Sequence, residues 1–141
     1  MILLSGTRQW TDKEYIRWAL EGFPRTTQFI HGGAKGLDTL AHEVATELGF
    51  PEPIIVRPEY DYWFKKIGKA GFKVAPNKRN VLMLEGKKTE EGSVDPSQIP
   101  FKVLAFFIGD KESGGTGNCV KEARKRNIFP ICFHLGLTIN V

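Results

Sequence analysis

The stretch His31-Gly32-Gly33-Ala34-Lys35-Gly36-Leu37-Asp38 decides the fold that we predict for this chain. Residues 27–30, directly before it, are short and apolar enough for a strand. Apolar residues after it recur at helical spacing up to Gly49, where a helix is expected to end. The segment therefore predicts a strand, a glycine turn and a helix.

Such a turn is suited to an anion. Glycines let the backbone come close to a ligand, and the free N–H groups at a helix N-terminus favour phosphate or carboxylate. The alternative is a tight turn that binds nothing. The spacing matches neither G-x-G-x-x-G nor the P-loop G-x-x-x-x-G-K-[ST], so neither of those mechanisms transfers.

Length and composition indicate one globular domain. The chain has 141 residues, of which 41% are hydrophobic and 26% charged, as in ordinary soluble proteins. No run approaches the ~18 apolar residues of a membrane span, and no basic region precedes the apolar residues 1–4. We therefore expect a cytoplasmic protein with no leader and no membrane segment. Cys119, Cys132 and the three histidines lack metal-ligand spacing, so we predict free thiols, no metal and no required cofactor.

The net charge is +4 and the isoelectric point is near 9.1. This balance permits binding to nucleic acid or to a small polyanion but requires neither. Basic residues concentrate in the middle of the chain, at 65–88, and again at 121–126. A solvated, lysine-rich surface is the alternative interpretation of both groups.

Predicted strands alternate with predicted helices along the whole chain. This alternation is typical of an α/β domain in which helices cover both faces of a parallel sheet. The polar residues 86–100 are predicted to form a surface excursion. The expected strands are 2–4, 27–30, 54–56, 101–108 and 128–133, and the expected helices begin near Asp12, Leu37, Pro76 and Asn118.

Three segments rich in small residues each follow a predicted strand: 5–8, 31–38 and 113–118. In parallel α/β sheets, ligands bind off the carboxyl ends of the strands, at the point where the strand order switches. Three such turns at one edge of a sheet are a stronger indication of a binding site than any one of them alone. Residues 57–64 add four aromatic side chains near lysines, which predicts either stacking on a base or ordinary packing.

The order of these motifs resembles the YspA-like branch of the SLOG superfamily. The resemblance covers nearly the whole chain apart from the 86–100 excursion. The matching motifs are Ser5-Gly6-Thr7-Arg8 followed by Trp10, His31 to Asp38, Trp63 with Gly68-Lys69-Ala70-Gly71, Arg79-Asn80 with Met83, and Gly114-Gly115-Thr116.

The resemblance implies a Rossmann-like three-layer sandwich with a mostly parallel sheet. The superfamily also includes the DNA-processing protein A, the cytokinin-activating phosphoribohydrolases and sensor domains for nucleotide signals. The resemblance also implies a protein that sequesters or senses a nucleotide-derived ligand of the ADP-ribose or cyclic nucleotide class. In a phage, such a protein would act as a sponge against nucleotide-signalled immunity. Relatives commonly assemble, so a homo-oligomer is expected.

The resemblance implies a role for individual residues: Arg8 is expected to contact an anion, and Trp63 is expected to cover a base. Asp38 takes ribose hydroxyls or caps a helix, and 114–118 cradles phosphate. The predicted ligand-binding residues are Ser5, Gly6, Thr7, Arg8, His31, Gly32, Gly33, Ala34, Lys35, Asp38, Trp63, Lys69, Arg79, Asn80, Gly114, Gly115, Thr116, Gly117 and Asn118.

One departure from the phosphoribohydrolase motif, Pro-Gly-Gly-x-Gly-Thr-x-x-Glu, bears on catalysis. Aligning its glycine pair on Gly114-Gly115 places Lys121 at the catalytic glutamate, and Glu122 stands one residue late. A step of one residue turns a helical side chain by about 100°, away from the water that it would activate. Binding is therefore the first hypothesis. An N-glycosidase or other nucleotide hydrolase, using Glu122, Asp38, Asp110 or Glu112, and a single-stranded DNA-binding protein are the alternatives.

Overall fold

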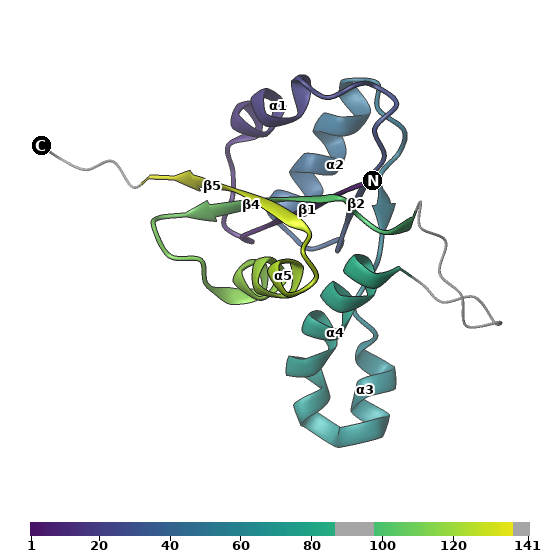
Figure 1. The fold of residues 1–141 in the computed structure, drawn as a ribbon. Coiled ribbons are helices and arrows are strands. Elements are labelled where there is room, and N and C mark those ends of the chain that lie inside the picture. The colour runs from purple at the N-terminus through teal and green to yellow at the C-terminus, as the bar shows by residue number, and fades with distance from the viewer. Residues whose placement is uncertain (87–97, 137–141) are drawn as a thin grey trace, which may run out of the picture.

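A parallel five-stranded sheet in the order β3-β2-β1-β4-β5 organises the protein (Figure 1). The structure is a computed structural model that describes residues 1–86 and 98–136. The strand order reverses between β1 and β4, so the carboxyl ends of these two strands form the switch point at which such sheets bind ligands. The strands are β1 (Ile2–Gly6), β2 (Phe29–His31), β3 (Ile54–Ile55), β4 (Lys102–Ile108) and β5 (Phe129–Leu135).

Helices cover both faces of the sheet, so the predicted three-layer α/β architecture of Rossmann-like type is confirmed. α1 (Lys13–Glu21) and α2 (Leu37–Glu47) lie on one face, and α4 (Gly71–Glu85) and α5 (Gly114–Lys125) lie on the other (Figure 1). α3 (Tyr60–Ile67) and a short 3-10 turn, η1 (Gly68–Ala70), precede α4.

Alternating strand residues supply the two halves of the core. Leu4 and Phe106 pack with the first pair of helices, and Leu3 and Phe107 pack with the second pair. Successive side chains of a strand point to opposite faces, so β1 and β4 need apolar residues at nearly every position when both faces are covered. This requirement explains the uninterrupted apolar runs from which these strands were predicted.

Two helix ends match the sequence prediction. The carboxylate of Asp12 caps α1 by accepting a hydrogen bond from the Tyr15 backbone N–H at 3.0 Å. α2 ends at Glu47 with Leu48 as its C-cap, and Gly49 takes a φ of +84° directly after the cap.

Three helix predictions were wrong. Residues 60–67 were not assigned to a helix, α4 begins five residues before Pro76, and α5 begins at Gly114 rather than near Asn118. The errors at α4 and α5 share a cause, because glycine and proline were taken as local breaks. Gly71 instead allows close contact, since a Cβ there would collide with the backbone of Trp63 and separate α3 from α4.

The 86–100 excursion falls mostly on residues 87–97, which lie outside the described residues. Within the part of the chain that the structure describes, no helix combines the length and the apolar character needed to cross a membrane.

We predict that Gly36→Ala strongly destabilises the fold. Gly36 has a φ of +76°, and a Cβ there would collide with the backbone of Arg8, where the loop after β1 meets the start of α2. Strain and overlap together are expected to lower the free energy of unfolding by at least about 2 kcal/mol, measured by urea denaturation.

Gly22→Ala is the matched control for this variant. Gly22 also flanks a helix, at the C-terminal end of α1, but its φ is −78° and an added Cβ would meet nothing within 4 Å. Its free energy of unfolding is expected to stay within about 0.5 kcal/mol of the wild type. Equal effects of the two substitutions would contradict the tight contact at Gly36.

Candidate functional site

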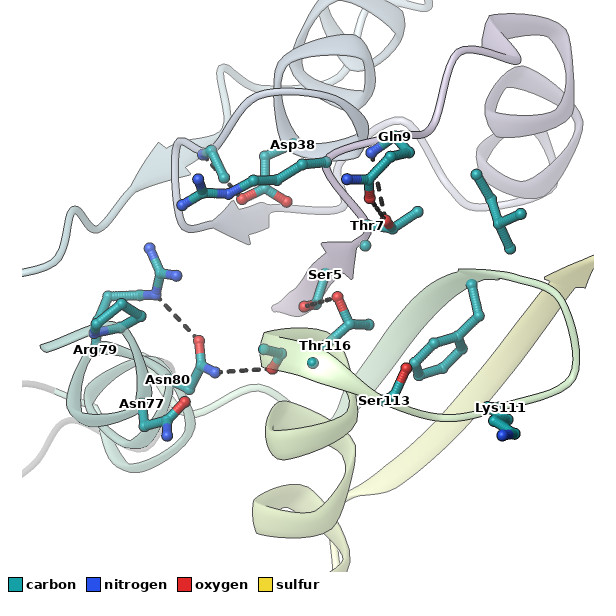
Figure 2. A pocket seen from close by; sticks show the side chains of 18 of the residues that line it. Ser5, Thr7, Gln9, Asp38, Asn77, Arg79, Asn80, Lys111, Ser113 and Thr116 are labelled. Carbon is teal, nitrogen blue, oxygen red and sulfur yellow. Dashed lines mark hydrogen bonds between the residues drawn. The ribbon is translucent and has the colours of Figure 1, made fainter. Parts of the chain in front are cut away.

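A cavity of about 520 Å³ lies at the carboxyl ends of β1 and β4, where the strand order reverses (Figure 2). This volume is within the usual range of small-molecule sites, ~300–1,000 Å³. The loop after β1, the start of α2, one side of α4 and the start of α5 form its walls. Its lining residues are Ser5, Gly6, Thr7, Arg8, Gln9, Ala34, Asp38, Phe72, Lys73, Pro76, Asn77, Arg79, Asn80, Phe107, Ile108, Lys111, Ser113, Gly114, Gly115 and Thr116.

The loop after β1 is held to the elements on both sides of it. The Ser5 hydroxyl donates to the Thr116 hydroxyl at 3.5 Å, which links β1 to the first turn of α5 (Figure 2). The Thr7 carbonyl accepts the N–H of Leu37 at 3.2 Å, which links the same loop to the start of α2. Arg8 is exposed and lines the cavity, where its guanidinium is available to an anion.

The N-terminus of α5 opens into the cavity through Ser113, Gly114, Gly115 and Thr116. The first backbone bond of the helix runs from the Gly117 N–H to the Ser113 carbonyl at 3.1 Å, so the N–H groups before Gly117 precede the helical ladder. A Cβ added at Gly114 or Gly115 would meet nothing within 4 Å. Open space therefore lies beside the positive end of the helix dipole.

Asp38 lines the same cavity, and one of its carboxylate oxygens is unsatisfied among the described residues. Its side chain is 5% exposed, and Oδ2 accepts the N–H groups of Gly32 at 3.2 Å and Ala34 at 3.1 Å. Oδ1 is buried and has no hydrogen-bond partner among the described residues. Burial raises the pKa of this carboxyl from 3.8 to about 6, against the opposing effect of the Ala34 N–H and of Arg79 and Arg8. A buried acceptor of this kind is costly unless a ligand donates to it.

Arg79 and Asn80, adjacent on α4, connect three segments of the site. The Arg79 guanidinium donates from Nη1 to the Gly32 carbonyl at 2.7 Å and from Nε to the Asn80 amide oxygen at 3.0 Å. The Asn80 amide nitrogen in turn donates to the Gly115 carbonyl at 3.2 Å (Figure 2). Both side chains line the cavity, but their hydrogen bonds to the protein position the glycine turn and α5.

His31 supports the glycine turn from behind. It is buried, and its Nδ1 accepts the Gly33 N–H at 3.0 Å, which leaves Nε2 to donate to Nδ1 of His42 at 2.8 Å. Burial, with smaller effects from His42 and two arginines, lowers its pKa to about 4. The ring is therefore neutral near pH 7 and orients the turn. His31 was predicted to bind a ligand, and in the structure its ring contacts the turn backbone.

The structure brings eleven of the predicted site residues together around the cavity: Ser5, Gly6, Thr7, Arg8, Ala34, Asp38, Arg79, Asn80, Gly114, Gly115 and Thr116. The other eight lie outside its lining. His31, Gly32 and Gly33 belong to the turn or to the end of β2 and make contacts within the protein, and Lys35 is exposed. Gly117 packs against the backbone of Glu112, and Asn118 accepts a hydrogen bond from Asn80. Trp63 and Lys69 lie on α3 and η1.

Sequence reasoning missed much of the wall that α4 forms. Phe72, Lys73, Pro76 and Asn77 recur with Asn80 at spacings of three and four residues, which places them on one side of a helix. This signal becomes visible once α4 is known to begin before Pro76. The other lining residues outside the list of predicted ligand-binding residues are Gln9, Phe107, Ile108, Lys111 and Ser113.

Two of the candidate catalytic carboxylates are engaged elsewhere. Glu122 pairs with Arg126 at 2.7 Å, and Glu112 pairs with Arg124 at 2.9 Å. These partners lower the pKa of both carboxyls. Neither they nor Asp110 line the cavity, whereas Asp38 does.

Comparison with known proteins gives no further assignment, since no family model, curated protein or solved structure matches the chain. The relationship to the SLOG superfamily therefore stays a prediction from its motifs.

We predict that Asp38→Asn makes the protein more stable at neutral pH. A carboxyl whose pKa is higher in the folded state loses stability as pH rises, because ionisation is easier in the unfolded chain. Between pH 4 and 7 the wild type is expected to lose about 2 to 3 kcal/mol relative to the variant, as follows from a rise from 3.8 to about 6.

Urea denaturation of both proteins across this pH range measures the difference. The free energy of unfolding of the variant is subtracted from that of the wild type at each pH. This subtraction removes the contribution of His31, which titrates in both proteins. A difference that stays constant with pH would contradict the raised pKa of Asp38.

Proposed function

We propose that the cavity binds a nucleotide or nucleotide-derived signal, of the ADP-ribose or cyclic nucleotide class. The observation that carries this proposal is that one cavity is lined both by a carboxylate, which accepts hydrogen bonds, and by the N-terminus of a helix, which donates them. Asp38, whose buried Oδ1 has no partner among the described residues, lines one wall, and the open N-terminus of α5 lies on another. A hydroxyl donor such as a ribose satisfies the first, and a phosphate satisfies the second.

The remaining side chains fit such a ligand. Arg8, Lys73, Arg79 and Lys111 line the cavity, and Asp38 is the one acidic residue among the described lining. A polyanion is therefore attracted, while the single carboxylate acts as a local hydroxyl acceptor. The apolar lining at Phe72, Pro76, Phe107 and Ile108 offers a surface for a base.

Sequestering or sensing fits the cavity better than turnover. The glutamate nearest the catalytic position of the related hydrolases, Glu122, is held by Arg126 and Lys125 outside the lining. Within the proposal, membership of the YspA-like branch, a role as a phage sponge against nucleotide-signalled immunity, a cytoplasmic location and a homo-oligomer all stay predictions.

One observation favours hydrolysis as a second candidate. Asp38 is within the cavity, and burial raises its pKa to about 6, close to the range in which a carboxyl exchanges protons at neutral pH. In that case Asp38 would act as a general base toward water at a bound nucleotide.

The test is calorimetric titration with AMP, ADP, ADP-ribose and cyclic nucleotides, together with mass spectrometry of small molecules released from the purified protein. We expect at least one nucleotide to bind with a Kd below 1 mM and to be released intact. Release of a cleaved base or ribose phosphate would favour the hydrolase. Failure of every nucleotide to bind would contradict the proposal.

We predict that Gly115→Asp weakens nucleotide binding at least tenfold while the fold is retained. The added side chain enters open space, and an acidic residue in the first turn favours the helix. The same carboxylate repels a phosphate by several kcal/mol at ~4 Å if the effective dielectric constant is about 20.

Gly22→Asp is the matched control, since it adds the same charge in an open position at the far end of α1. Calorimetry is expected to give an unchanged Kd for this variant. Equal weakening by both substitutions would indicate a general charge effect and would contradict phosphate binding at α5.

A further inference from the structure

The α3–α4 hairpin, residues 60–85, is a second basic surface beyond the cavity. α3 extends away from the sheet and packs mainly on η1 and α4 (Figure 1). No residue of α3 is buried. The hairpin thus presents to its surroundings side chains that the core does not use.

The hairpin carries the net charge of the whole protein. Residues 60–85 contain six Lys or Arg and two Asp or Glu, and the rest of the chain contains fourteen of each kind. Lys65, Lys66, Lys69, Lys73 and Lys78 are all exposed. None of the five forms an ion pair with a described carboxylate.

Aromatic rings lie among these cations. Tyr62 is 52% exposed, Phe64 is 46% exposed, and Phe72 is 50% exposed and stacked on Phe64 with ring centroids 5.2 Å apart. Trp63 lies within reach of two ammonium groups, at 5.2 Å from that of Lys66 and 5.4 Å from that of Lys78. Exposed rings of this size are unfavourable in water unless a partner covers them.

We propose that the α3–α4 hairpin binds single-stranded nucleic acid. Unpaired bases offer flat faces that stack on exposed aromatic rings, and their backbone phosphates match the unpaired lysines between the rings. A duplex keeps its base faces stacked on each other, so it can use the lysines alone. A second copy would bring one hairpin of net charge +4 against another, and an acidic peptide would leave the rings unmatched.

The hairpin adjoins the cavity along α4. The lining residues that belong to it are Phe72, Lys73, Pro76, Asn77, Arg79 and Asn80. The proposal does not depend on nucleotide binding in the cavity, because the charge and the rings lie along α3 and the first turns of α4.

The test is fluorescence anisotropy of a labelled 20-nucleotide oligo(dT), with a duplex of the same length for comparison. In the double variant Lys65→Glu, Lys69→Glu, we expect at least tenfold weaker binding near 50 mM salt. The slope of log K against log salt should fall in magnitude by roughly 1.4, because each phosphate contact on a single strand contributes about 0.7.

The matched control is Lys121→Glu, Lys125→Glu, which makes the same change of charge on exposed positions of α5. We expect less than a twofold effect from it. An equal loss in both double variants would overturn the proposal, since charge alone would then explain binding.

A second pair of substitutions tests stacking. Tyr62→Leu with Phe64→Leu keeps apolar bulk on the helix but removes two flat rings. It should weaken oligo(dT) binding at least fivefold with an unchanged salt slope, as loss of base stacking predicts. Unchanged affinity, or equal affinity of the wild type for duplex and single strand, would overturn the proposal.

Two further results separate this proposal from the others. Gly115→Asp should retain oligo(dT) binding even if it abolishes nucleotide binding in the cavity. Sedimentation of the wild type and of the aromatic variant measures assembly, and dissociation of an oligomer by these substitutions would identify the hairpin as a subunit interface and overturn the proposal.

Discussion

The hydrogen bonds of Arg79 and Asn80 fix the relative positions of the segments that enclose the cavity. From one turn of α4, Arg79 donates to the carbonyls of Gly32 at 2.7 Å and Val56 at 3.4 Å, which follow β2 and β3. Asn80, 3% exposed, donates to the Gly115 carbonyl in the first turn of α5. Buried backbone carbonyls need partners, so these two side chains satisfy groups that sheet and helix leave open.

The backbone of Gly32 contacts two side chains of opposite charge, Asp38 and Arg79. The Gly32 N–H donates to the Asp38 carboxylate, and its carbonyl accepts from the Arg79 guanidinium. A Cβ at Gly32 would overlap that guanidinium, so a side chain there would displace Arg79 from the Gly32 carbonyl. Arg79 opposes the rise in the pKa of Asp38, but burial has the larger effect. The turn therefore encloses the Asp38 carboxyl, and the balance of burial and nearby donors sets the pKa of that group.

Local pattern was sufficient for the sheet but not for the helices at the cavity. β1 and β4 are buried on both faces, so their apolar runs were visible in the sequence. Residues at the carboxyl end of a strand or at the start of the next helix, such as Ser5 and Asp38, could be placed at one edge for the same reason. The α4 wall was missed because its start depends on contact between Gly71 and Trp63, which is a tertiary feature.

The roles of single side chains were harder to predict than their neighbourhood. Arg79 was predicted to bind the ligand, and the structure shows hydrogen bonds from its guanidinium to backbone carbonyls. Trp63 was expected to cover a base in the cavity, and it lies instead beside Lys66 and Lys78 on the hairpin. The position of a residue in the sequence predicts which strand it follows, and so which edge of the sheet it lies near. The group that a long side chain contacts depends on elements far away in sequence.

Some of the glycines at the start of α5 are required by the fold, and one of them has no such structural reason. Each glycine in a helix costs up to about 1 kcal/mol relative to alanine. Gly114 has a φ of +70°, and Gly117 would collide with the backbone of Glu112 if it carried a Cβ, so both have structural reasons. Gly115 has neither a positive φ nor a neighbour within 4 Å of an added Cβ, yet it lines the cavity. Its lack of a side chain keeps the helix N-terminus open, which is the property that phosphate binding requires.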